Sequence, residues 1–296
     1  MYALERAAVC AERGVADRPI TLATRADLKL LDRQALRGLI DRVLMGAYAE
    51  EGLDALLAAG VLEALLPEVR AMVGFGDGEW RHKDVWKHTK QVVSQSTSRL
   101  EVRWAALLHD IGKVKTRSIS ADGEVHFFGH AEVGARMFDK LERREGLFVE
   151  EQELKSAVRF LVLHHLRASQ YDGKWTDSAV RRFAREMGPH LEDLLCLSRA
   201  DITTKRREKK RRGIAMIDEL NHRIGELALE DAKAPALPTG IGNELMTAFK
   251  LPPSRLIGDI KRALEGAVLA GELPGQEPSG FYVEFVAQNR KRFGLE

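Results

Sequence analysis

The stretch RWAALLHDIGKVK, residues 103–115, ends an apolar helical run with a histidine and an aspartate side by side. One interpretation of this doublet, His109-Asp110, is an ordinary helix C-terminus, in which Gly112 stops the helix and Lys113 lies near the negative end of its dipole. The other interpretation is a metal site, because an unpaired buried carboxylate is costly and a bound metal removes that cost. The second interpretation requires further ligands elsewhere in the chain.

The composition is that of a globular protein. The 296 residues are 45% hydrophobic and 30% charged, and the net charge of +2 provides no overall field that would attract nucleic acid or a membrane. The two cysteines, Cys10 and Cys196, form no spaced disulfide framework, which suits a reducing compartment. Since no signal-type or membrane-length apolar run is present either, we expect a cytoplasmic protein without a membrane partner.

Helical periodicity dominates the chain. Apolar residues recur at three- and four-residue steps in segments such as 149–166, 177–187 and 255–273. The exception is Ser118–Phe128, SISADGEVHFF, where an Asp-Gly turn followed by alternating apolar residues predicts a small β-hairpin. Because strands and helices do not alternate, the predicted fold is all-α, a helical bundle with one hairpin.

Loops and linkers that contain glycine and proline divide the chain into three predicted regions. Residues 1–68 form helical hairpins, and a glycine-rich loop then opens a central region, residues 69–204. Residues 205–296 hold a basic helix, a proline-containing linker and a C-terminal helical module.

Further metal-type side chains lie at or near the ends of other apolar helical runs. They are His88, His130, His164, His165 and Asp201. Together with the doublet, His88 and Asp201 would supply a mixed nitrogen and oxygen shell that suits Mn, Fe, Co, Ni, Zn or Mg better than a closed structural zinc site. Taken singly, each histidine could instead be an ordinary hydrogen-bonded core or surface residue. Asp201 could be an ordinary carboxylate at the end of a helix. The joint arrangement favours a metal site.

The order of these residues resembles the HD-domain superfamily of metal-dependent phosphohydrolases, whose pattern is H…HD…D with optional further histidines. In this resemblance His88 is the first histidine, the doublet is the HD pair and Asp201 is the last carboxylate. His130, with one or both of His164 and His165, corresponds to the extra histidines of members that hold a second metal. The resemblance implies an all-α HD bundle with one or two divalent ions.

A narrower resemblance covers residues from about 35 to 285. DVWKHT, RWAALLHDIGK, FFGHAEVGARM, WTDSAVRRFARE and LEDLLCLSRAD are similar to the HD region of bacterial tRNA nucleotidyltransferases and their poly(A) polymerase relatives. Residues 35–68 resemble the helical neck before that region, and residues 239–273 resemble the tail after it. Nucleotidyl transfer in that family needs a β-sheet head with a Gly-Ser motif and an Asp-x-Asp pair. Because this sequence has no such aspartate pair, we expect it not to add CCA or poly(A) by itself.

What the resemblance implies is divalent-metal phosphohydrolase activity on nucleotides or RNA ends, as a 2′,3′-cyclic phosphodiesterase, 2′-nucleotidase or phosphatase. The residues agree, since a metal at the doublet would polarise a phosphate oxygen and lower the pKa of a bound water to near 7. His130 and His164 either bind a second metal or protonate the leaving oxygen.

Four basic side chains are candidates for binding the substrate phosphate. Lys113 follows the doublet and is either a phosphate ligand or a helix-end cation. Of Arg181 and Arg182, one is expected to face the cavity, because helical neighbours diverge by about 100°. Arg167, two residues after the histidine pair, is a further candidate.

The run KRREKKRR, Lys205–Arg212, lies directly after Asp201. It is either a solvated helix face or a contact for RNA phosphates, through Lys205, Arg206, Lys209 and Lys210. No aromatic residues interrupt it, so sequence-specific RNA recognition is not indicated.

Two other functions compete with the enzyme. One is a helical module that binds tRNA, or a separate nucleotidyltransferase chain, with a secondary or silent HD site. The complete ligand set favours the enzyme. The other is a dNTP triphosphohydrolase or cyclic-dinucleotide phosphodiesterase, which lacks support because no Gly-Tyr-Pro follows the histidine pair. The sequence leaves open the metal, the number of ions, the oligomeric state, and whether the substrate is a mononucleotide or an RNA terminus.

Overall fold

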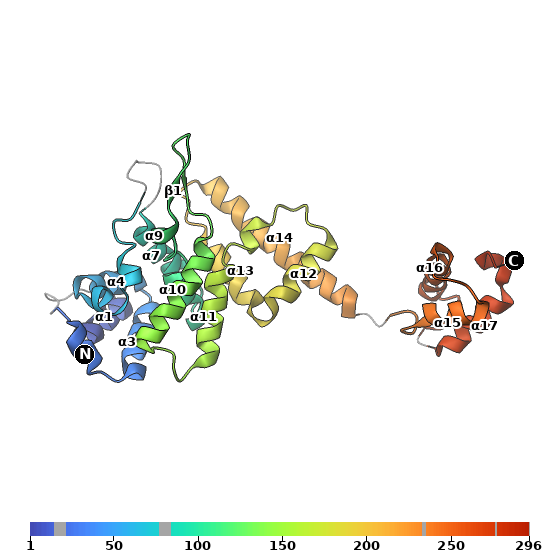
Figure 1. The fold of residues 1–296 in the computed structure, drawn as a ribbon, viewed down its shortest axis with the longest axis horizontal. Helices are drawn as coiled ribbons and strands as arrows, with labels where there is room; N and C mark the ends of the chain where they lie inside the picture. The colour runs from blue at the N-terminus through green and yellow to red at the C-terminus, as the bar shows by residue number, and fades with distance from the viewer. Residues whose placement is uncertain (15–21, 77–83, 233–234, 276, 296) are drawn as a thin grey trace. The chain divides into compact units, whose positions relative to one another are not determined.

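The computed structural model describes residues 1–14, 22–76, 84–232, 235–275 and 277–295 (Figure 1). It divides into two compact units, Met1–Gly225 and Glu226–Glu296. The described residues form helices and one two-stranded antiparallel sheet, in which β1 (Ser118–Ile119) pairs with β2 (Val125–His126). This confirms the predicted all-α fold with a single hairpin, whereas the three-region division stays a prediction.

The N-terminal part of the first unit is a layer of closely packed helices. They are α1 (Tyr2–Arg13), α2 (Arg25–Lys29), α3 (Arg33–Met45), α4 (Ala49–Ala58), α5 (Val61–Leu65) and α6 (Pro67–Arg70). α1 buries small residues, including Ala7 and Ala11, against α3 and α4. A Cβ atom at Gly52 would lie only 2.5 Å from the Cβ of Ala11, so the small residues allow this close approach.

The central bundle of the first unit surrounds one buried helix. Its members are α7 (Val85–Gln95), α8 (Leu100–Leu108), α9 (Lys113–Thr116), α10 (His130–Glu145), α11 (Gln152–His164), α12 (Asp177–Met187) and α13 (Leu191–Asp201), with short 3-10 turns at Ala168–Gln170 and Gly188–His190. α8 contacts α3, α7, α11 and α13. Its Trp104 is fully buried, packs edge-to-face on Phe148 and donates its indole N–H to Asp41 at 2.7 Å. α8 therefore ends inside the bundle.

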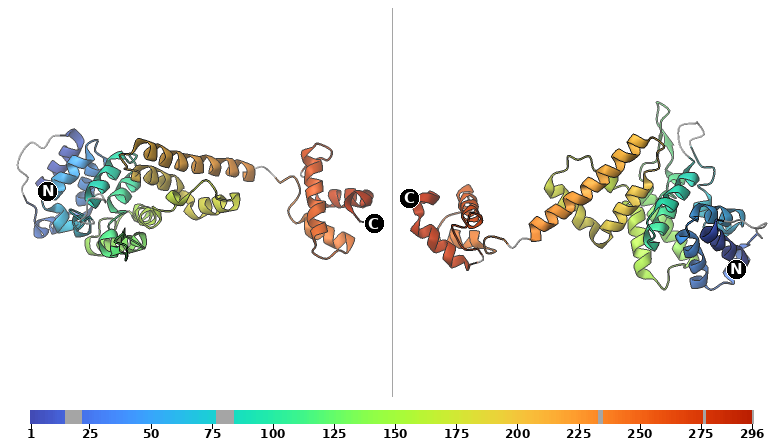
Figure 2. Two further views of the ribbon diagram at one scale, coloured as in Figure 1. Left: turned by 90° about the horizontal axis from the view of Figure 1, so that it is seen from above. Right: turned by 180° about the vertical axis from the view of Figure 1, so that it is seen from behind.

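The long helix α14 (Arg207–Ala232) follows the bundle, and Figure 2 shows its N-terminal end beside the β-hairpin. The second unit continues with α15 (Ile241–Phe249), α16 (Arg255–Leu269), α17 (Ser279–Gln288) and the 3-10 turn Arg290–Phe293. It has its own apolar core, including Leu245, Leu264 and Tyr282. Among the described residues, no helix combines the length and apolar character that a membrane crossing requires.

Candidate metal centre

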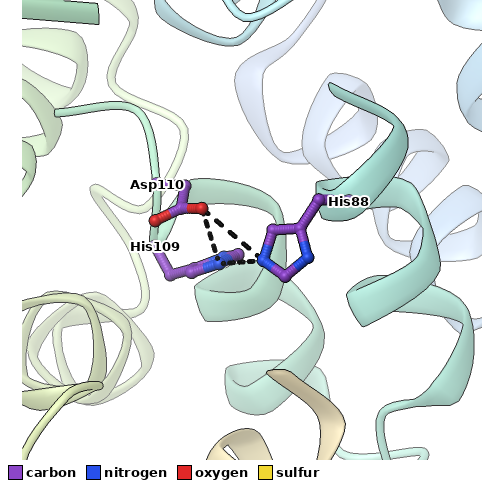
Figure 3. Close-up of side chains that lie close together, drawn as sticks. All are labelled: His88, His109 and Asp110. Atoms are coloured by element: carbon purple, nitrogen blue, oxygen red, sulfur yellow. Dashed lines mark hydrogen bonds and ion pairs between the residues drawn. The ribbon is translucent and has the colours of Figure 1, made fainter. Parts of the chain in front are cut away.

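The end of α8 places the doublet in the interior. His109 follows the last residue of α8, and both His109 and Asp110 are buried. His88 from α7 points at the same place, as Figure 3 shows. Asp201, the last residue of α13, completes a group contributed by three helices.

The first donor set consists of His88, His109, Asp110 and Asp201. The Nε2 atoms of the two histidines are 3.3 Å apart, and they lie 3.6 Å and 3.3 Å from Oδ2 of Asp110. Oδ1 of Asp201 lies 2.9 Å from His88 and 3.6 Å from His109. Two ligands about 2.1 Å from one ion are themselves roughly 3.0–3.4 Å apart. The spacing of His88, His109 and Asp110 therefore fits a single divalent ion, and Asp201 lies within ion-pair distance of both histidines.

The second donor set shares the carboxylate of Asp110. The Nε2 atoms of His130 and His165 are 3.2 Å apart and lie 3.5 Å and 4.0 Å from Oδ1 of Asp110. All three side chains are buried, and their donor atoms are close enough together to hold an ion. Asp110 thus presents Oδ2 to one set and Oδ1 to the other.

Hydrogen bonds fix which ring nitrogen faces each set. In His109, His130 and His165, Nδ1 lies 2.7–2.8 Å from the carbonyl oxygen of the residue three positions earlier. Because a carbonyl oxygen only accepts, each Nδ1 donates, and Nε2 is the nitrogen available to a metal. Nδ1 of His88 is 2.8 Å from the hydroxyl of Thr203. Thr203 was not predicted as a site residue, and its nearness to Asp201 in the chain is the one signal that could have identified it.

The charges of the two sets differ in the metal-free protein. Burial opposes a charge on His109, but the carboxylates of Asp110 and Asp201 raise the pKa of its imidazole to about 10. Although burial opposes ionisation of the two aspartates, the surrounding cations hold their pKa values below the usual range. Burial lowers the pKa of His165 to about 4 and also lowers the pKa of His130. The second set is therefore already in the neutral imidazole form that binds metals.

We predict that metal binding releases about one proton, from His109. Below a pKa of about 10 the metal must displace that proton from Nε2, so the apparent affinity should rise with pH, by up to about tenfold per unit between pH 6.5 and 8.5. Isothermal titration with Mn²⁺ in buffers of different ionisation enthalpy measures the proton count. An affinity that does not change over this range would contradict the prediction.

Lys113, the first residue of α9, lies at the same centre. Its Nζ is 2.6 Å from Oδ2 of Asp110 and 5.7 Å from the centre of the Phe127 ring. The ion pair and the aromatic contact hold the ammonium group beside the first donor set.

Gly112 does not act as the helix stop that one interpretation of the sequence proposed. Its φ of −68° is right-handed, and α9 begins at the next residue. A Cβ atom at this position would lie 2.0 Å from the carbonyl oxygen of His130 and 2.7 Å from the amide nitrogen of Gly134. The glycine therefore lets the turn after the doublet pack directly against α10, which carries His130.

We predict that Gly112→Ala destabilises the protein and disturbs the second donor set. The clash is with backbone rather than with a flexible side chain, so we expect a loss of unfolding free energy of about 1–3 kcal/mol and weaker metal binding. Urea unfolding measures the first effect and metal titration the second. Gly38→Ala, where an added Cβ meets nothing within 4 Å, is the matched control, and equal behaviour of the two variants would contradict the prediction.

An open cleft leads to the first donor set. Its volume is about 900 Å³, and His88, Asp110 and Asp201 line it together with Lys113 and Phe127. Of the basic run, the cations Arg206, Lys209 and Arg212 also line this cleft, together with Glu208. Of the other two predicted RNA contacts, Lys205 is not part of this lining, and Lys210 lies 3.3 Å from Oε1 of Gln95.

One predicted ligand lies outside the donor sets, and the three arginines predicted to bind the substrate phosphate are not among the described residues that line the cleft. His164 lies outside both sets and packs on the ring of Phe160, at 4.3 Å between ring centres. Arg167 forms an ion pair with Glu186 at 2.6 Å, and Arg182 lies 4.0 Å from the same carboxylate. Neither these arginines nor Arg181 is among the described residues that line the cleft.

Comparison with known proteins defines the class. Residues 82–206 match the HD domain family, so the chain contains an HD domain around the two donor sets. The match confirms the resemblance predicted from the H…HD…D order.

The chain is also homologous to tRNA nucleotidyltransferases over its HD-containing region. It is 30% identical over 264 residues to the A-adding tRNA nucleotidyltransferase of Deinococcus radiodurans, and the matched region is 85% of this chain and 58% of that protein. It is 31% identical over 253 residues to the CC-adding tRNA nucleotidyltransferase of Thermus thermophilus, covering 83% of this chain and 55% of that protein. The multifunctional CCA protein of Pseudomonas paraeruginosa is 34% identical over 152 residues, half of this chain. The chain thus spans less than two thirds of each of these relatives.

Proposed function

We propose that this protein is a divalent-metal-dependent phosphohydrolase that acts on nucleotides or RNA ends. The observation that supports the proposal most strongly is the position of Asp110, whose two carboxylate oxygens each lie beside a separate pair of histidine Nε2 atoms. The cleft at this position is large enough for a nucleotide, and Lys113 lies on its wall. The HD domain adds support, because it suggests the metal-dependent phosphohydrolase superfamily.

The donor sets indicate which residues would hold the metals. His88, His109, Asp110 and Asp201 would hold one ion, while Asp110, His130 and His165 would hold a second. Ions bound there would polarise a phosphate oxygen and lower the pKa of a water to near 7. The buried imidazoles, each held by its Nδ1 hydrogen bond, keep the donor atoms in place so that little reorganisation is needed.

Lys113 supplies a positive charge for the substrate. Its ammonium group lies at the junction of the cleft and the first donor set, where a phosphate oxygen would be bound. The flexible side chain of Lys113 can rotate from Asp110 to the phosphate. Its compact ammonium charge can bind a phosphate oxygen without a fixed two-pronged geometry. We assign Lys113 to phosphate binding and the two aspartates with His88 and His109 to the catalytic metal.

The partners follow from the relatives. The nucleotidyltransferases named above act on tRNA according to their names, and we propose tRNA or a tRNA fragment as a source of the RNA end. A silent module that only binds RNA would not require seven donor atoms grouped in two sets. The geometry therefore supports the enzyme over the binding module.

Hydrolysis of 2′,3′-cyclic AMP tests this function. Purified protein is first freed of metal with EDTA and then assayed with Mn²⁺, Ni²⁺, Co²⁺, Mg²⁺ or Zn²⁺. We expect turnover only after a divalent ion is restored, with an adenosine monophosphate or adenosine and phosphate as products. Protein that binds these ions but hydrolyses none of 2′,3′-cyclic AMP, 2′-AMP and an oligoribonucleotide ending in a 2′,3′-cyclic phosphate would overturn the proposal.

A further inference from the structure

The basic run presents a row of cations to the cleft. Arg206, Lys209 and Arg212 line the cleft together with the metal donors, and they recur at every third residue where α14 begins. Because a helix rises about 1.5 Å per residue, this row extends over roughly 9 Å. The N-terminal end of α14 lies near the β-hairpin (Figures 1 and 2), and Phe127, just after the hairpin, lines the same cleft.

The three cations are available to bind anions. Within the described parts of the chain, no ion pair is recorded for Arg206, Lys209 or Arg212. Glu208, the one acidic residue of the run, also lines the cleft, but its carboxylate forms an ion pair with Arg211 at 2.7 Å. Three like charges along one wall repel one another, and anionic groups bound along that wall would relieve the repulsion.

A mononucleotide does not account for the whole row. It carries one phosphate group, which the metal centre and Lys113 would take. Cations spread over roughly 9 Å match an anion with several phosphates in succession, and a nucleic acid strand has this form. Among the described residues that line the cleft, Phe127 is the one aromatic side chain, so we expect the contact to be to the backbone.

We propose that Arg206, Lys209 and Arg212 bind the backbone phosphates of an RNA strand whose 3′-terminal phosphate lies at the metal centre. This inference rests on the proposed function and selects its substrate class, an oligoribonucleotide end in preference to a free mononucleotide. The strand enters along the beginning of α14, and recognition is independent of base sequence.

The test compares two substrates and two variants. The substrates are 2′,3′-cyclic AMP and an oligoribonucleotide of about ten residues that ends in a 2′,3′-cyclic phosphate, a length that more than spans the row. The cleft variant is Lys209→Gln/Arg212→Gln. The control is Arg207→Gln/Arg211→Gln, which removes the same charge from residues that line a different surface hollow. Its lost ion pair with Glu208 is mostly exposed and worth little.

We expect the wild-type protein to prefer the oligoribonucleotide in kcat/KM. In the cleft variant this preference should fall by about tenfold or more. For the oligoribonucleotide, the negative slope of log kcat/KM against log salt should become shallower by about 1.4, the value for two lost phosphate contacts on a single strand. The control variant should keep the preference. An equal loss in both variants, or no preference in the wild-type protein, would overturn the inference.

A binding measurement separates this inference from the proposed function. If neither substrate is hydrolysed, the proposed phosphohydrolase fails. Fluorescence anisotropy with a labelled oligoribonucleotide bearing a 3′-phosphate then tests RNA binding by the three cations independently of hydrolysis. Weaker binding in the cleft variant alone supports the row as an RNA site, and equal binding by both variants refutes it.

Discussion

Asp110→Asn should abolish both metal binding and hydrolysis while the protein stays folded. The substitution keeps the size of the side chain but removes the charge that both donor sets share. We expect kcat/KM for 2′,3′-cyclic AMP to fall by at least about a thousandfold, equivalent to about 4 kcal/mol of transition-state stabilisation. Steady-state assays measure the loss, and circular dichroism with thermal unfolding checks the fold.

A second aspartate on a ligand-bearing helix provides the control. Asp139 lies on α10, the helix that begins with His130, and forms a surface ion pair with Arg159 at 2.8 Å. Asp139→Asn should bind metal and turn over substrate like the wild-type protein, because an exposed pair contributes little. The assignment of Asp110 fails if its asparagine variant keeps bound metal and more than a tenth of the activity.

His165→Ala and His164→Ala should differ sharply although the two residues are adjacent. His165 contributes Nε2 to the second donor set, whereas His164 packs on Phe160 outside both sets. Loss of His165 should reduce the metal content from two ions to one and lower kcat/KM by about a hundredfold or more, a loss of several kcal/mol from one ion. His164→Ala should retain both ions.

Metal analysis after gel filtration, paired with the cyclic AMP assay, distinguishes the two histidines. Each variant removes one imidazole at the end of α11, and thermal unfolding checks that the loss of the buried His165 ring leaves the protein folded. If His164→Ala lost an ion and His165→Ala did not, the second donor set would be wrongly composed.

Much of the fold and of the first donor set could be predicted from the sequence. The Asp-Gly turn gave the hairpin, and the apolar run before His109 gave the buried helix that carries the doublet. The order of His88, the doublet and Asp201 identified residues that the structure brings within hydrogen-bonding or ion-pair distance. These features depend on local patterns, which the sequence contains directly.

Features that depend on long-range packing were not predicted. Periodicity could not decide between His164 and His165, because neighbours on a helix diverge by about 100° and the flanking residues are apolar on both sides. The pairing of Arg167 with Glu186, 19 residues away, could not be read from spacing. The role of Gly112 depends on its contact with the backbone of α10, which only the folded chain shows.

The most direct test of the central claim is a titration of metal-free protein with Mn²⁺, in which bound metal and hydrolysis of 2′,3′-cyclic AMP are measured on the same samples. The structure predicts that binding saturates at two ions per chain and that turnover rises with occupancy. The Asp110→Asn variant should bind none and remain inactive. A wild-type protein that takes up no divalent ion, or whose turnover does not change as ions bind, would contradict the assignment of this centre.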